Sequence, residues 1–171
     1  MKIITFFLTL ICFFNLSAQN NIQCKTTNFW QKGRYVINGS LSFTELKNNP
    51  ETNFWFNPNF DTAQTNSQLI QLLQKNNDLK WIIFVGTWCD DTRAILPEFF
   101  KNFTQANLDI NNVQLIGVDR NKKTFNKLHK TYKVENVPTF IMFRNNMEVS
   151  RIEEYGKDNN FILSLISLLK F

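Results

Sequence analysis

Hydrophobic positions follow a regular order along most of the chain. Trp81–Val85 is a continuous apolar run, which is typical of a strand buried on both faces of a sheet. Residues 113–118 form a second run of this kind. Residues 139–143 and 148–153 predict two further strands, and Asn145-Asn146 between them predicts the turn of a hairpin.

Apolar side chains at helical spacing separate these strands. Thr65 and Gln68 resemble a capping box in front of a first helix. A second helix is predicted from about Cys89 to Gln105, where Pro97 must remove one backbone hydrogen bond and bend the helix. A third helix is predicted from helical spacing, and a fourth begins behind a cap at Asp158. The apolar stripes of these last two helices are Phe125, Leu128, His129 and Tyr132, and Phe161, Ile162, Leu165, Ile166 and Leu169.

The order strand, helix, strand, helix, strand, strand, helix predicts an α/β fold. We expect a central mixed β-sheet, with a parallel half and an antiparallel hairpin, flanked by helices. These elements form a domain over residues 65–171. Residues 19–64 are expected to be an N-terminal extension that packs on this domain. It contains a strand around Tyr35–Ile37, a short helix around Phe43–Lys47 and an aromatic, turn-rich ordered loop over residues 53–60.

Composition favours one globular domain with a real core, since 43% of the 171 residues are hydrophobic and 19% are charged. The formal net charge is +5, and the cationic residues form no arginine-rich cluster. A charge of this size gives little support for nucleic-acid binding.

Residues 1–18 have the pattern of a secretory signal peptide: Lys2, an apolar run, and a small residue, Ala18, at the cleavage point. The run is too short for a membrane span, which needs roughly 20 apolar residues, so no stable membrane anchor is expected after cleavage. Removing this segment takes away Lys2 and Cys12, which leaves a charge of +4 and two cysteines, Cys24 and Cys89. We therefore expect an exported protein, periplasmic or secreted, in a Gram-negative bacterium.

Cys89 is the residue with the clearest chemistry, because it lies where a buried strand gives way to the bent helix. A helix N-terminus presents unpaired backbone N–H groups and the positive end of the helix dipole, and both stabilise a thiolate. Asp90 and Asp91 oppose the thiolate, whereas Arg93 favours it. Because exposed carboxylates are screened by solvent, we expect the thiolate to be favoured overall.

Four features occur around this cysteine in a fixed order: a Trp-Cys pair after a buried strand, a proline in the next helix, a Val-Pro-Thr before the next strand, and a glycine after the hairpin. They are Trp88-Cys89, Pro97, Val137-Pro138-Thr139 and Gly156. Together they resemble the thioredoxin superfamily from Thr65 to the end of the chain. More narrowly, Trp-Cys-x-Asp-Thr-Arg resembles the motif of small exported thioredoxin-like proteins of Bacteroidetes type.

The resemblance implies a thioredoxin-like fold and roles for six residues. Cys89 would be the catalytic nucleophile, tuned by Thr92 and Arg93. The Val137–Pro138 bond would be cis, and these two residues would form the substrate-binding edge. Trp88 would complete it as an apolar wall. The partners implied are protein or small-molecule thiols and disulfides, with no cofactor and no metal.

Two departures from the family pattern change the expected chemistry. Thr92 replaces the second cysteine of Cys-x-x-Cys, and Ile83 stands where the family has a buried acid. A dithiol cycle therefore cannot run within the motif. The Thr92 hydroxyl is placed to donate a hydrogen bond to the Cys89 thiolate, which favours monothiol exchange resolved by an external thiol or by Cys24.

Other interpretations stay open. The chain is either a thiol–disulfide oxidoreductase without a resolving cysteine or a redox-inactive binding module that holds a partner segment along the Pro138 groove. Cys24 and Cys89 are also able to form a structural bridge. His129, the only histidine, is interpreted as a structural residue on a helix stripe rather than a general base. Asp90 and Asp91 beside one cysteine do not form a typical metal site.

Overall fold

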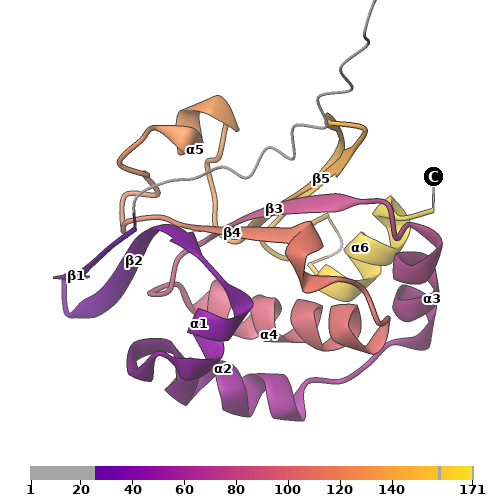
Figure 1. The fold of residues 1–171 in the computed structure, drawn as a ribbon, viewed down its shortest axis with the longest axis horizontal. Coiled ribbons are helices and arrows are strands. Elements are labelled where there is room, and N and C mark those ends of the chain that lie inside the picture. The colour runs from indigo at the N-terminus through magenta and orange to yellow at the C-terminus, as the bar shows by residue number, and fades with distance from the viewer. Residues whose placement is uncertain (1–25, 158, 171) are drawn as a thin grey trace, which may run out of the picture.

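A computed structural model describes residues 26–157 and 159–170 (Figure 1). Six strands form one sheet in the order β1-β2-β4-β3-β5-β6. Only β3 and β4 run parallel among neighbouring strands of the described chain, and the other four pairs are antiparallel. The strands are β1 (Thr27–Gln31), β2 (Arg34–Leu41), β3 (Lys80–Val85), β4 (Val113–Gly117), β5 (Thr139–Arg144) and β6 (Met147–Glu153).

Most of the helices lie on one side of this sheet, and α5 lies on the other (Figure 1). The central strand shows why both faces are covered. Trp81, Ile83 and Val85 point into a large cluster beneath the helices, whereas Ile82 and Phe84 belong to a smaller cluster on the α5 side. The helices are α1 (Phe43–Asn48), α2 (Pro50–Thr62), α3 (Ser67–Lys75), α4 (Asp90–Gln105), α5 (Leu128–Thr131) and α6 (Phe161–Leu168), with a short 3₁₀ turn at Ile110–Asn112.

The predicted α/β fold with a central mixed sheet flanked by helices is confirmed. The predicted hairpin is also found, and its turn residues Asn145 and Asn146 have φ values of 52° and 63°. Positive φ at both central residues gives the turn the twist of its flanking strands.

Residues 53–60 were predicted to be a loop, and this prediction is wrong, because they lie inside helix α2. Asn49 caps this helix by accepting from the Glu51 N–H at 2.9 Å, and Pro50 begins it. Trp55 and Phe56 are buried against the rest of the core. Packing of these aromatic side chains outweighs the turn-forming character of the asparagines and of Pro58 around them.

Three boundary predictions also need correction. The cap of α3 is Asn66 and not Thr65, since the Asn66 side chain accepts from the Leu69 N–H. Phe125 lies outside α5 and is exposed. Asp158 lies outside the described residues, and α6 is capped by Asn160.

The described part of residues 19–64 is joined to the remaining chain by both sheet and helix contacts. Strand β2 pairs with β4, and α2 packs along α4. The predicted signal peptide, residues 1–18, lies outside the described residues, as does Cys24. No helix in the described chain has the length and apolar character needed to cross a membrane.

Candidate active site

Cys89 occupies the N-cap position of α4, directly after β3 and a short loop. Its backbone N–H donates to the Gly86 carbonyl at 2.9 Å, and its own carbonyl accepts from the Arg93 N–H at 3.1 Å. The thiol Sγ donates to the Val137 carbonyl at 3.3 Å. Within the described chain its side chain makes no capping hydrogen bond to α4. A sulfur at this position lies at the positive end of the helix dipole, which favours a thiolate.

Val137 lies against this sulfur, and Pro138 follows it in the chain. The peptide bond between them is cis. Both residues are buried, with the Val137 residue only 2% exposed. Val137 shares the smaller apolar cluster with Trp88 and Cys89. The structure therefore brings Cys89, the predicted nucleophile, together with Trp88 and Val137, and Pro138 follows Val137 across the cis bond.

Trp88 is held in a fixed orientation beside Cys89. Its indole Nε1 donates to the Val118 carbonyl at 3.0 Å, and the Arg120 guanidinium lies 5.3 Å from the ring centroid. The ring folds back over Gly86, where an added Cβ would come within 2.8 Å of a ring carbon. A glycine at position 86 is therefore needed for the ring to take this place.

Thr92 is fully buried, but its hydrogen bond differs from the expected one. Its hydroxyl oxygen accepts from the Gly86 N–H at 3.3 Å. The predicted hydrogen bond from Thr92 to the sulfur of Cys89 is not formed in the described structure, where the sulfur contacts the Val137 carbonyl instead. Thr92 thus holds the loop that carries Trp88 and Cys89 and replaces the second thiol with a group that cannot form a disulfide.

Thr87 fixes the same loop to the N-terminal part of the sheet. Its hydroxyl donates to the Tyr35 carbonyl at 2.9 Å and accepts from the Ile37 N–H at 3.3 Å. Sequence reasoning missed Thr87, because its partners lie about 50 positions away and no local pattern connects them.

Arg93 turns away from the sulfur toward α2. Its Nε donates to the Thr87 carbonyl at 3.1 Å, and its guanidinium lies 5.6 Å from the Trp55 ring centroid. Burial, followed by repulsion from Arg34, lowers the pKa of Arg93, and attraction to Asp90 and Cys89 opposes this shift. Arg93 therefore acts on the sulfur only through space, while its hydrogen bond positions the loop.

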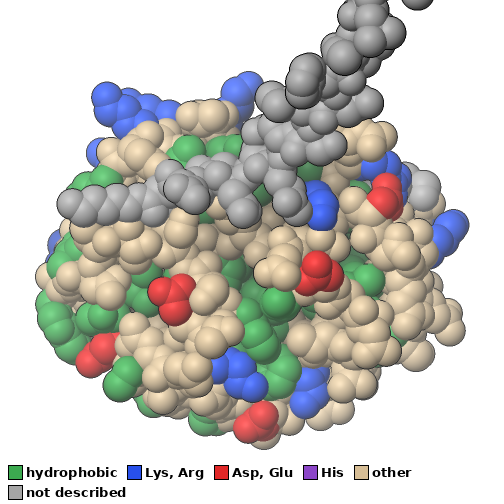
Figure 2. All heavy atoms as spheres, in the orientation of Figure 1, with side chains coloured by type: hydrophobic (Ala, Val, Ile, Leu, Met, Phe, Trp, Pro, Cys, Tyr) green, Lys and Arg blue, Asp and Glu red, His purple; other side chains and the backbone are tan. Residues whose placement is uncertain are grey.

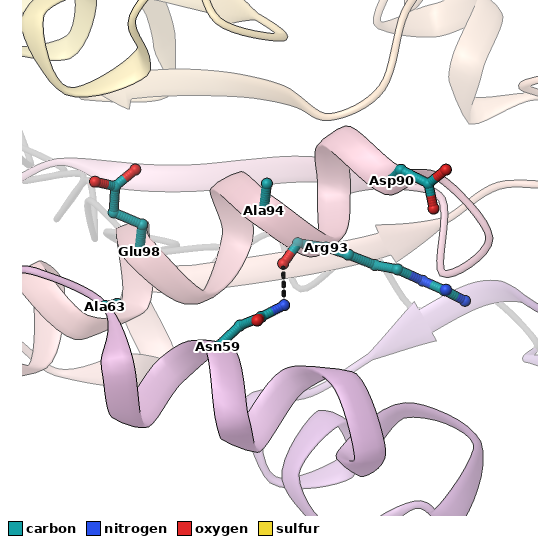
Figure 3. Close-up of a pocket in the computed structure, with 6 residues that line it drawn as sticks. All are labelled: Asn59, Ala63, Asp90, Arg93, Ala94 and Glu98. Carbon is teal, nitrogen blue, oxygen red and sulfur yellow. Dashed lines mark hydrogen bonds between the residues drawn. The ribbon is translucent and has the colours of Figure 1, made fainter.

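An open hollow of about 340 Å³ lies between α2 and α4 on the outer side of this site (Figure 3). Asp90 and Arg93 lie at one end of it and Glu98 at the other. Burial raises the pKa of Glu98. Across the hollow, the Asn59 side chain donates to the Arg93 carbonyl at 3.0 Å. Pro97 has no N–H to donate to this carbonyl, so Asn59 supplies the hydrogen bond that the proline removes.

Tyr155 follows β6 and approaches the first turn of α4 from the opposite side. Burial raises its pKa, and a hydrogen bond to Asp91 and the charge of Cys89 act in the same direction. Asp91 thus has a partner at the site that the sequence did not indicate.

His129 lies in α5 and makes a structural contact with the loop before this helix. Its Nδ1 accepts from the Thr124 N–H at 3.0 Å. Ile83 is fully buried in β3, so an aliphatic side chain occupies the position of the family's acid. Among the described residues, no three His, Cys, Asp or Glu side chains gather closely enough to hold a metal ion. Cys89 is a free thiol there, and its predicted bridge to Cys24 stays a prediction.

Comparisons with known proteins match the part of the chain that carries this site. The model of the family described as Thioredoxin matches residues 61–167. Thioredoxin Y, chloroplastic, of Oryza sativa subsp. japonica is 28% identical over 107 residues, which make up 63% of this chain and 61% of the rice protein. The thioredoxin of Chlamydia pneumoniae is 32% identical over 84 residues, or 49% of this chain and 76% of that protein.

Solved structures of thioredoxins are also similar to this chain. Thioredoxin of Fasciola hepatica is 23% identical and covers 62% of this chain and 95% of its own, with a TM-score of 0.38. Thioredoxin f2 of Chlamydomonas reinhardtii is 21% identical and covers 63% of this chain and 96% of its own, with a TM-score of 0.40.

Proposed function

The chain belongs to the thioredoxin family, and from this premise we propose that it carries out monothiol thiol–disulfide exchange through Cys89. The observation that supports this most directly is the position of the sulfur. It is half-buried at the N-terminus of α4 and contacts the Val137 carbonyl at 3.3 Å. A sulfur placed there meets both the helix N–H groups and any segment that docks along Val137 and Pro138.

The proposed reaction is a thiolate displacement. The Cys89 thiolate attacks one sulfur of a substrate disulfide, a Cys89–substrate disulfide forms, and the second substrate sulfur leaves as a thiolate. Because Thr92 supplies no second thiol, an external thiol then attacks the mixed disulfide and releases Cys89. Cys24 is the alternative resolving group in the same chain.

We place this activity outside the cytoplasm, in the periplasm of a Gram-negative bacterium. The signal-like pattern of residues 1–18 supports export. The motif Trp-Cys-x-Asp-Thr-Arg is similar to that of exported thioredoxin-like proteins of Bacteroidetes type. The proposed partners are disulfides and thiols of proteins or small molecules.

The second candidate is a redox-inactive module that holds a partner segment in the same groove. Two departures from the family pattern favour it. Thr92 supplies no second thiol, and the buried Ile83 supplies no acid to accept a proton.

Replacing Cys89 with serine distinguishes the two functions. The purified protein is mixed with glutathione disulfide, and intact mass spectrometry follows the mixed disulfide. We expect the adduct on the parent protein and on Cys24→Ser, and none on the double variant Cys24→Ser, Cys89→Ser. If the parent protein forms no adduct at Cys89 while Cys89→Ser still binds partner peptides, exchange is excluded and the binding module is supported.

A further inference from the structure

The segment that links β4 to β5 carries a concentrated positive charge beside the active site. We call residues 119–133 the basic loop. They include six of the chain's 19 Lys and Arg residues and one carboxylate, Asp119. The cations are Arg120, Lys122, Lys123, Lys127, Lys130 and Lys133. Figure 2 shows Lys and Arg side chains gathering at the edge of the molecule over α5, which belongs to this loop.

The basic loop contacts the groove at two places. The Arg120 guanidinium lies 5.3 Å from the Trp88 ring centroid, next to Cys89. The Lys122 ammonium donates to the Asn136 side chain at 2.7 Å, next to Val137. A segment lying along Cys89 and Val137 therefore passes directly beside the loop.

Hydrogen bonds fix the conformation of the basic loop. The side chain of Asn38, which is only 1% exposed, donates to the Lys123 carbonyl at 2.9 Å and accepts from the Phe125 N–H at 3.2 Å. The Asp119 carboxylate accepts from the backbone N–H groups of residues 121 and 123, both at 2.9 Å or less. Such bonds hold the cations in place before any partner arrives.

These cations are not neutralised within the described chain. The three ion pairs found there join Arg34 to Asp90, Arg144 to Asp78 and Arg151 to Glu148, and none involves the basic loop. The one carboxylate of the loop is occupied by backbone N–H groups. The positive charge is therefore presented to solvent.

Carboxylates also lie near the groove, and Glu153 shares the Asn136 side chain with Lys122. Asp90 and Asp91 begin α4, and Glu153 accepts from the Asn136 side chain at 3.1 Å. The basic loop also presents Phe125, which is 65% exposed and lies 6.0 Å from the Phe29 ring. The groove thus has a basic loop with an apolar contact beside it, and this loop favours a docked chain that carries negative charge there.

We propose that the basic loop is the docking surface for an acidic segment of the partner protein whose disulfide reacts with Cys89. The inference rests on the proposed function for the reaction, whereas the docking itself depends only on the charge and the geometry of the loop. Acidic side chains of the partner lie over Lys123, Lys127 and Lys130, and its backbone continues past Cys89 toward Val137. Opposite charge on the two surfaces raises the rate of encounter and excludes basic partners.

The test uses two peptides of equal length, each with one disulfide-linked chromophore on its cysteine. One peptide has Asp and Glu flanking the cysteine, and the other has Lys at the same positions. We expect the purified protein to release the chromophore about 10- to 100-fold faster from the acidic peptide at low salt. At about 1 M salt, where the screening length falls to about 3 Å, the difference should disappear.

Charge reversal locates the effect. The triple variant Lys123→Glu, Lys127→Glu, Lys130→Glu should lose or invert the preference. The matched control is Lys75→Glu, Lys80→Glu, Lys170→Glu, whose exposed lysines lie at α3, the start of β3 and the C-terminal end. These elements stand at the opposite end of the sheet (Figure 1), so the control should keep the preference. Far-UV circular dichroism checks that both variants fold.

The outcomes separate docking from chemistry. Equal release from both peptides, or the same loss in both triple variants, would overturn the docking surface while leaving exchange intact. If neither peptide reacts, binding of cysteine-free versions is measured by fluorescence anisotropy. Preferential binding of the acidic peptide then supports the docking surface, while the lack of release contradicts the proposed exchange reaction. Binding of a single-stranded oligonucleotide as tight as that of the acidic peptide would instead identify a general polyanion site and overturn the proposal.

Discussion

At the scale of single residues, several polar side chains of the site act on backbone groups that the local chain leaves unpaired. Thr92 accepts from the Gly86 N–H, and Asn59 donates to the Arg93 carbonyl. The second contact compensates for Pro97, which lies inside α4 and has no N–H of its own. The geometry of the helix that presents Cys89 therefore depends on a side chain from a different helix.

The contact between Asn59 and Arg93 predicts a coupling between Asn59 and Pro97. Asn59→Ala should lower the free energy of unfolding by about 0.5–1.5 kcal/mol, because it removes one hydrogen bond. In a Pro97→Ala background the same change should have a smaller effect, since the new N–H of residue 97 donates to the Arg93 carbonyl. Urea unfolding of the four proteins in this cycle measures the coupling, and equal losses in both backgrounds would contradict it.

At the scale of elements, the long apolar strands and helices around Cys89 were predictable from the sequence, whereas α2 was not. A buried strand of five apolar residues, such as Trp81–Val85, shows its burial in its own composition. The aromatic side chains of α2 lie among asparagines and Pro58, so the local pattern indicates turns. Its helix is stabilised by burial of Trp55 and Phe56 against distant residues, which is information that a local pattern does not contain.

The candidate site divides in the same way. The motif residues Trp88, Cys89, Val137 and Pro138 were predictable as a group because the resemblance fixes their order along the chain. The contacts of Thr87 and Tyr155 were not, since each depends on partners brought close only by the folded sheet. The predicted bond from Thr92 to the sulfur is not formed in the described structure. The contact found instead, from the Gly86 N–H to the Thr92 hydroxyl, depends on the path of the loop, which spacing along the sequence does not show.

The contact between His129 in α5 and Thr124 in the preceding loop predicts a pH response. Burial is the main cause of its lowered pKa, with repulsion from Lys130 and Lys123 adding to the shift and Asp119 opposing it. Protonation of Nδ1 would also break its hydrogen bond from the Thr124 N–H. The unfolded chain binds this proton more readily than the folded chain does. The contribution of His129 to the free energy of unfolding is therefore complete above about pH 6.5 and should fall as the pH drops below it.

Hydrogen exchange at the Thr124 amide tests this response. We expect its protection factor to fall below about pH 6.5 in the parent protein. His129→Asn is the matched variant, since an amide oxygen accepts the same hydrogen bond but does not titrate in this range. A protection factor with the same pH dependence in both proteins would assign the effect to other groups.

At the scale of the whole molecule, sheet and helix contacts join the described chain across the predicted boundary at residues 64 and 65. Strand β2 pairs with β4, and α2 packs along α4. Thr87 adds a link from the cysteine loop to the backbone of β2. The N-terminal elements therefore complete the sheet and support the loop that carries Cys89.

Two buried tryptophans on either side of this boundary report whether the chain unfolds as a unit. Trp55 lies in α2 and Trp81 in β3, and both belong to the same large apolar cluster. One variant keeps only Trp55 and the other keeps only Trp81, with Phe at the remaining tryptophan positions. Since these side chains share one core, we expect the fluorescence midpoint of each variant to coincide with the midpoint of its own circular dichroism transition in urea. A Trp55 transition that precedes the circular dichroism change, with the Trp81 transition following it, would show that the N-terminal elements form a separate unit and that the site can stand without them.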